Sequence, residues 1–142
     1  MKSKPLVLDH LRTVHESVVI DFTFQNNITI LTGSAGTGKT MVFSFISECE
    51  ASNPDVICFN YLNTQEEIED NIFFAERKLI VIDNADVLLT DKIRKHISLD
   101  DKNQYLIIGR NPKNFFATKE NFYELEKTVI NNQTVMKLKP TF

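Results

Sequence analysis

A cluster of glycines is the feature of this 142-residue chain that most constrains its fold. Three of its four glycines, Gly33, Gly36 and Gly38, lie within six residues, in the pattern Gly-x4-Gly-Lys-Thr. Residues 28–32, rich in isoleucine and leucine, predict a short buried strand before the cluster, and residues 41–46 predict a buried helix after it. Glycine permits positive φ and carries no side chain, so this loop can turn successive backbone N–H groups toward an anion. The positive end of the following helix faces the same point, which predicts a phosphate-binding loop.

The residues that follow the glycines suit a nucleotide with its metal ion. Lys39 can reach the β- and γ-phosphates, and the Thr40 hydroxyl can ligate Mg²⁺. Backbone N–H groups from residue 35 to residue 41 would hold the phosphates. The predicted nucleotide-binding residues of this segment are Gly33, Ser34, Ala35, Gly36, Thr37, Gly38, Lys39, Thr40 and Met41.

An aspartate further along the chain supports a magnesium site. Residues 79–82 are four apolar residues that predict a buried strand, and Asp83 follows them directly. A carboxylate at a strand end, one strand–helix unit after a phosphate loop, is placed to bind the metal. We therefore predict Thr40 and Asp83 as the Mg²⁺ ligands.

These two motifs, Walker A at residues 33–40 and Walker B at residues 79–83, resemble the ASCE branch of P-loop NTPases, in particular minimal AAA+ or STAND-like ATPase domains. The resemblance implies an α/β, three-layer P-loop NTPase fold whose mostly parallel sheet is flanked by helices. It also implies a sensor strand between the two motif strands. Residues 106–111 fit that strand, with Arg110 or Asn111 directed toward the γ-phosphate.

The remaining pattern predicts one domain over residues 1–142. Residues 18–24 alternate like a half-buried edge strand, and Asn26-Asn27 would turn it into an antiparallel neighbour of the phosphate-loop strand. The alternation around Asn131-Asn132 predicts a C-terminal β-hairpin. Further predicted elements are strands at 5–8, 56–59 and 105–108, a helix opened by a capping box at 64–67, and a helix at 91–97.

The sequence departs from the ASCE pattern at the position that usually activates water. These enzymes place a glutamate after the Walker B aspartate, whereas this chain has Asn84, whose amide cannot accept a proton at neutral pH. Asp86 is either a substitute or a solvated loop carboxylate, and the sequence leaves both open. The predicted catalytic residues are Lys39, Asp83, Asp86 and Arg110. No helical lid is expected after the sensor strand, so the second domain of AAA+ proteins is not predicted. The GTPase motif Asn-Lys-x-Asp is absent, so ATP is expected in preference to GTP.

The expected function is Mg–ATP binding with slow ATP hydrolysis. Two alternatives stay open: a nucleotide-dependent switch or interaction module with little catalysis, and a small P-loop kinase. Fast phosphoryl transfer often needs an arginine finger, which a second copy of the chain or a protein partner would have to provide.

Composition limits which binding partners and which cellular compartment are expected. The net charge of −3 gives no global attraction to nucleic acid or to an anionic membrane, although a basic run at residues 92–96 leaves nucleic acid open. No apolar run is long enough to span a bilayer. Cys49 and Cys58 form no metal or redox motif, which predicts buried free thiols in a cytoplasmic protein.

Overall fold

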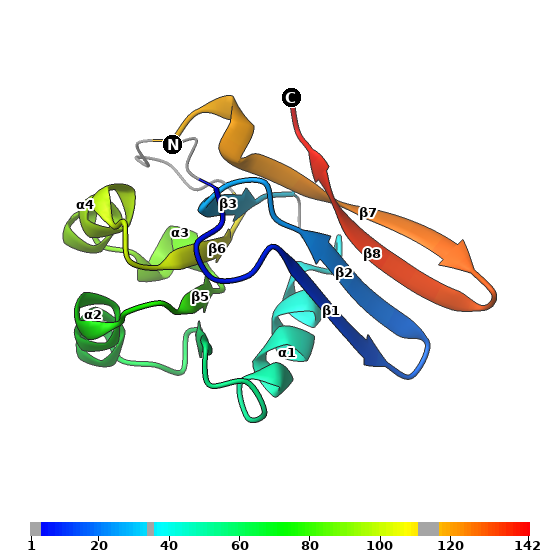
Figure 1. Cartoon of the computed structure of the whole chain (residues 1–142), viewed down its shortest axis with the longest axis horizontal. Helices are drawn as coiled ribbons and strands as arrows, with labels where there is room; N and C mark the ends of the chain where they lie inside the picture. The colour runs from blue at the N-terminus through cyan, green and yellow to red at the C-terminus, as the bar shows by residue number, and fades with distance from the viewer. Residues whose placement is uncertain (1–3, 34–35, 111–116) are drawn as a thin grey trace.

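The computed structural model describes residues 4–33, 36–110 and 117–142. These residues form one eight-stranded sheet in the order β1-β2-β8-β7-β3-β6-β5-β4 (Figure 1). The strands are β1 (His10–His15), β2 (Val18–Thr23), β3 (Ile28–Leu31), β4 (Val56–Phe59), β5 (Leu79–Ile82), β6 (Gln104–Ile108), β7 (Phe122–Ile130) and β8 (Gln133–Pro140). The helices are α1 (Lys39–Cys49), α2 (Gln65–Phe74), α3 (Ala85–Leu88) and α4 (Asp91–Leu99), with a 3₁₀ turn at Lys119–Asn121.

The predicted fold class, a three-layer α/β P-loop NTPase fold, is wrong. Strands occupy more of the described chain than helices do, and the sheet is mixed and curled like half of a barrel (Figure 1). Its two longest pairings, β1–β2 and β7–β8, are antiparallel. Two-residue turns close both hairpins, at residues 16–17 and 131–132, and such turns can join only antiparallel strands. The sequence reading followed the alternating strands and helices in the middle of the chain and treated the two ends as additions to a parallel sheet.

The predicted neighbour of the phosphate-loop strand is also wrong. β2 pairs with β1 and β8, whereas β3 pairs in parallel with β6 and β7. Asn26 and Asn27 do not form a tight turn between β2 and β3. Their side-chain amides donate to distant carbonyls instead, those of Glu120 and Asn103, respectively. The chain therefore crosses from one half of the sheet to the other at this point.

The first residues of the described chain differ from the prediction as well. Residues 5–8 form no strand, because side chains of Asn27 and Gln104 accept the backbone N–H groups of Leu6, Val7 and Leu8. The strand lies further along, at β1, whose alternation of polar and apolar residues was missed.

The four strands β3, β6, β5 and β4 run parallel, and all were predicted as strands. β3, β5 and β6 are buried along their whole length, as continuous apolar runs allow. One core cluster lies between α1 and the face that includes Phe22, Leu31 and Leu106. The other lies beneath α2, α3 and α4 on the opposite face (Figure 1). In the sheet, β6 lies between β3 and β5, and all three strands run parallel. Their carboxyl ends therefore lie at the same edge of the sheet.

Several local predictions are confirmed. Thr64 and Glu67 form the capping box that begins α2. The helix predicted at residues 91–97 is α4, which continues to Leu99. The C-terminal hairpin turns at Asn131 and Asn132, both with positive φ, as a type I′ turn requires. The short helix α3 was not predicted.

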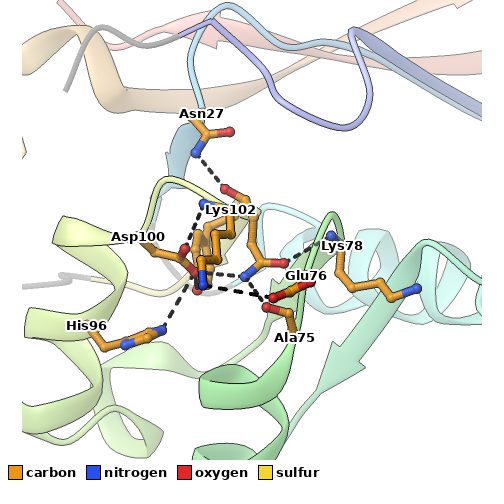
Figure 2. Close-up of polar contacts among 9 residues, drawn as sticks. Asn27, Ala75, Glu76, Lys78, His96, Asp100 and Lys102 are labelled. Carbon is orange, nitrogen blue, oxygen red and sulfur yellow. Dashed lines mark hydrogen bonds and ion pairs between the residues drawn. The ribbon is translucent and has the colours of Figure 1, made fainter.

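A polar network closes the opposite, amino-terminal edge of the same strands (Figure 2). The buried Asn103 side chain donates to the Ala75 carbonyl at 2.9 Å and to Asp100 Oδ2 at 2.8 Å, and accepts from the Lys78 N–H at 3.0 Å. Tyr105 also donates to Asp100, whose side chain is 4% exposed. These bonds satisfy buried polar groups and fix the loops that enter β5 and β6.

Candidate functional site

The glycine-rich loop, residues 32–38, joins β3 to α1. Gly33, Gly36 and Gly38 have φ values of 143°, 86° and 102°, so all three adopt the positive φ that the sequence predicts. Gly38 is the N-cap of α1 and the helix begins at Lys39. Other residues rarely adopt these angles, so the loop depends on glycine for its shape. Ser34 and Ala35 lie outside the described residues.

Lys39 lies back across this loop. Its Nζ donates to the Gly33 carbonyl and, at 3.4 Å, to Thr37 Oγ1. Burial lowers the pKa of Lys39, and the nearby Arg110 guanidinium lowers it further, while Asp83 and Asp86 act in the opposite direction. The predicted residues Lys39, Asp83, Asp86 and Arg110 therefore lie close enough to interact electrostatically.

Asp83 follows β5 directly, at the carboxyl edge of the sheet. Its backbone N–H donates to the Phe59 carbonyl on β4, and its Oδ1 accepts the Asn84 N–H at 2.9 Å. Burial raises the pKa of Asp83, although the Asn84 hydrogen bond and the Lys39 charge partly oppose this shift. Asn84 is exposed and has a positive φ of 57°. The strand end thus presents a partly desolvated carboxylate, for which a cation would be a favourable partner.

Asp86 is held against the tip of β6. Its Oδ2 accepts the Arg110 backbone N–H at 3.1 Å. A Cβ added to Gly109 would lie 2.0 Å from Asp86 Oδ1, so the fourth glycine of the chain leaves room for this carboxylate. Asp86 therefore joins α3 to the tip of β6, and one of its carboxylate oxygens accepts a backbone hydrogen bond there.

A cavity of about 730 Å³ lies over these groups. This volume is in the range of small-molecule and cofactor sites. Its lining consists of Gly36, Gly38, Lys39, Thr40, Met41, Asp83, Asn84, Gly109, Arg110 and Lys127. Most of the predicted site residues thus meet at one hollow, while Gly33, Thr37 and Asp86 are not part of its lining. Asn111 lies outside the described residues.

Sequence reasoning missed Lys127 and Gly109. Lys127 lies on β7, far along the chain from the loop, and no motif spacing connects the two. Gly109 follows the predicted sensor strand, but its need for glycine comes from the Asp86 carboxylate opposite it. Both contacts depend on tertiary structure.

The described residues offer no ready-made cation cage. No group of three or more His, Cys, Asp or Glu side chains among them is arranged to hold a metal. Thr40 and Asp83 both line the cavity, and their hydroxyl and carboxylate oxygens are the donors that would suit a magnesium ion. Two protein oxygens suffice where phosphate oxygens complete the coordination of Mg²⁺.

Other predictions concern the cysteines and the membrane. Cys49 and Cys58 are free, as predicted, but each is only half-buried. Burial raises the pKa of the Cys58 thiol to about 12. Within the part of the chain that the structure describes, no helix has the length and apolar character needed to cross a membrane.

No protein-family model, curated protein or solved structure matches this chain. Its function must therefore be inferred from the chemistry of the cavity and the groups around it.

Proposed function

We propose that this chain binds a magnesium–nucleoside triphosphate, with ATP as the expected nucleotide, and hydrolyses it slowly. The observation that carries the proposal is the cavity at the carboxyl edge of β3, β5 and β6. A positive-φ glycine loop, a helix N-terminus, a lysine and a carboxylate all face it. Each of these features favours binding of a phosphate chain with its cation.

The balance of charge supports an anionic ligand. Lys39, Arg110 and Lys127 line the cavity, whereas Asp83 is the acidic residue in the lining. Burial lowers the pKa of Lys39, and repulsion by the neighbouring Arg110 guanidinium lowers it further. A triphosphate would relieve this repulsion, because its charge is negative beside all three cations.

The residues present fit Mg²⁺ and the nucleotide in distinct roles. Thr40 and Asp83 would hold the metal, and the main chain of the glycine-rich loop would hold phosphate together with Lys39. The metal would neutralise charge on the phosphate oxygens when bound. Arg110, at the tip of β6, would contact the terminal phosphate.

Slow turnover follows from the residue at position 84. An exposed amide can orient a water molecule but cannot take its proton. Asp86 is the nearest alternative, yet one of its oxygens already accepts the Arg110 N–H. An arginine from a second copy of the chain or from another protein would be needed for fast turnover.

A second candidate function is a nucleotide-dependent switch with little catalysis, and Asn84 favours it. Turnover measurements separate the two. Slow but measurable hydrolysis by the wild-type protein that Asp86→Ala abolishes would support the enzyme. A near-zero rate that Asn84→Glu raises, with nucleotide affinity unchanged, would support the switch.

The test of binding is calorimetric titration of ATP, ADP and GTP, each with and without magnesium. The control is Lys39→Ala, which removes the ammonium together with its hydrogen bond to the Gly33 carbonyl. We expect magnesium-dependent ATP binding that raises the melting temperature of the wild type and leaves the variant nearly unchanged, through ligand linkage. The proposal fails if neither heat of binding nor a thermal shift is seen at millimolar ATP.

A further inference from the structure

Lys127 reaches the glycine-rich loop from the middle of β7. A Cβ built on Gly38 would lie 3.4 Å from both Cε and Nζ of Lys127, so the ammonium rests beside the N-cap of α1. Lys127 also lines the cavity with Lys39 and Thr40. A residue of the C-terminal hairpin therefore takes part in a site that is otherwise built from the β3, β5 and β6 loops.

The sheet fixes Lys127 in this place. Its cross-strand partner on β8 is Met136, which is buried and whose Cε would lie 3.4 Å from the same Gly38 Cβ. Both side chains thus project from the same face of the hairpin onto the loop. β7 in turn pairs with β3, the strand that leads into the loop.

The ammonium of Lys127 is not paired with a carboxylate in the part of the chain that the structure describes. Across the described residues, neither a hydrogen bond nor an ion pair engages this side chain, whereas the hairpin lysine Lys137 pairs with Asp21 at 3.5 Å. A third cation added to a cavity that already contains Lys39 and Arg110 is unfavourable unless an anion binds among them.

We propose that Lys127 binds the polyphosphate of the nucleotide, so that the hairpin contributes a phosphate ligand from outside the glycine-rich loop. This inference rests on the function proposed above. A lysine suits the role because its flexible stem carries a compact charge with three donors. A Cβ at Gly38 would be in van der Waals contact with this lysine, so the Lys127 side chain rests against the loop. The ligand chemistry is a chain of at least two phosphates, and the base of the nucleotide is not involved.

The experiment is calorimetric titration of two probes, Mg–ATP and inorganic tripolyphosphate, into wild-type and variant proteins. The variants are Lys127→Gln and Lys127→Arg, and the matched control is Lys139→Gln on the same hairpin. Lys139 is also exposed, but it lies an odd number of residues from Met136 on β8 and so projects from the opposite face.

We expect Lys127→Gln to raise Kd for both probes by about tenfold, the effect of one charge-assisted hydrogen bond. Its affinity should also depend less on salt than that of the wild type, because one screened charge pair is removed. Lys127→Arg should retain most of the affinity, and Lys139→Gln should match the wild type. Unchanged melting temperatures without ligand would show that all variants are folded.

Three results would overturn the inference. If Lys127→Gln binds both probes as the wild type does, the proposed function survives but the role of Lys127 does not. The same holds if Lys139→Gln weakens binding equally, because net charge would then explain the effect. If the wild type binds neither probe, both proposals fall together.

Discussion

Substitution of Gly109 by alanine tests the contact that organises the tip of β6. The added Cβ would lie 2.0 Å from Asp86 Oδ1, whereas an ordinary carbon–oxygen contact is about 3.4 Å. The Asp86 carboxylate must therefore turn away from its position. Its hydrogen bond from the Arg110 N–H, 3.1 Å long, is then lost.

The size of the effect follows from two opposing contributions. A hydrogen bond to a charged group is worth about 1.5–3 kcal/mol. Gly109 does not have a positive φ, so alanine can adopt its backbone conformation. Alanine also restricts the unfolded chain, which raises the free energy of unfolding by about 0.4–1 kcal/mol. We expect a net loss of about 1–2 kcal/mol in the free energy of unfolding, or roughly 3–6 °C in melting temperature.

A double-mutant cycle measured by urea denaturation isolates the cause. In an Asp86→Ala background, the new methyl group meets no carboxylate, so Gly109→Ala should be neutral or slightly stabilising. The coupling energy should be about 1.5–3 kcal/mol. Gly36→Ala is the comparison, because its Cβ would meet nothing within 4 Å and its cost would come from backbone strain at φ +86° alone. Equal losses from Gly109→Ala with and without Asp86 would refute the reasoning.

Three further substitutions have definite expected outcomes. Burial raises the pKa of Asp83, so the folded state binds the proton of this carboxyl more tightly than the unfolded state does. The resulting stabilisation is fully present below the ordinary carboxyl pKa and is lost as pH rises through the folded-state pKa, where the buried carboxyl ionises. Asp83→Asn should therefore raise the ligand-free melting temperature at pH 7 but not near pH 3, and should remove magnesium-dependent ATP binding; an equal gain at both pH values would contradict this. Asn103→Ala should lower the free energy of unfolding in urea by about 3 kcal/mol, because three partly buried hydrogen bonds lose the Asn103 side chain. Asn71→Ala, on an exposed helix face, should lower it by less than about 1 kcal/mol. Asn132→Val should destabilise the hairpin turn by about 1–2 kcal/mol and Asn132→Gly should not, a difference that thermal melting can measure.

The sequence predicted well wherever a few neighbouring residues determine the structure. The positive φ values of the loop, the capping box at Thr64 and the turn at Asn131-Asn132 each follow from local backbone chemistry. The buried strands were recognisable because continuous apolar runs suit strands covered on both faces. Asp83 and Lys39, which the sequence analysis places in one site, both line the cavity at the edge where these strands end.

The fold class and two residues of the cavity, Gly109 and Lys127, could not be predicted from local sequence patterns. Whether the C-terminal hairpin lies beside the sheet or is inserted between β2 and β3 depends on pairings between distant segments, which alternation alone does not specify. Asn26 and Asn27 looked like turn residues, yet their amides bond across the fold. Lys127 carries no motif, and only the register of β7 with β8 directs it to the loop.

The strand order also constrains how the chain assembles. The ladder of β1 and β2 reaches the rest of the sheet through β8, a strand that lies far from both along the chain. The β1–β2 hairpin therefore gains its other neighbour only when this distant segment docks beside β2. Such a long-range closure slows folding, and it makes the β2–β8 pairing the contact that joins the two halves of the sheet.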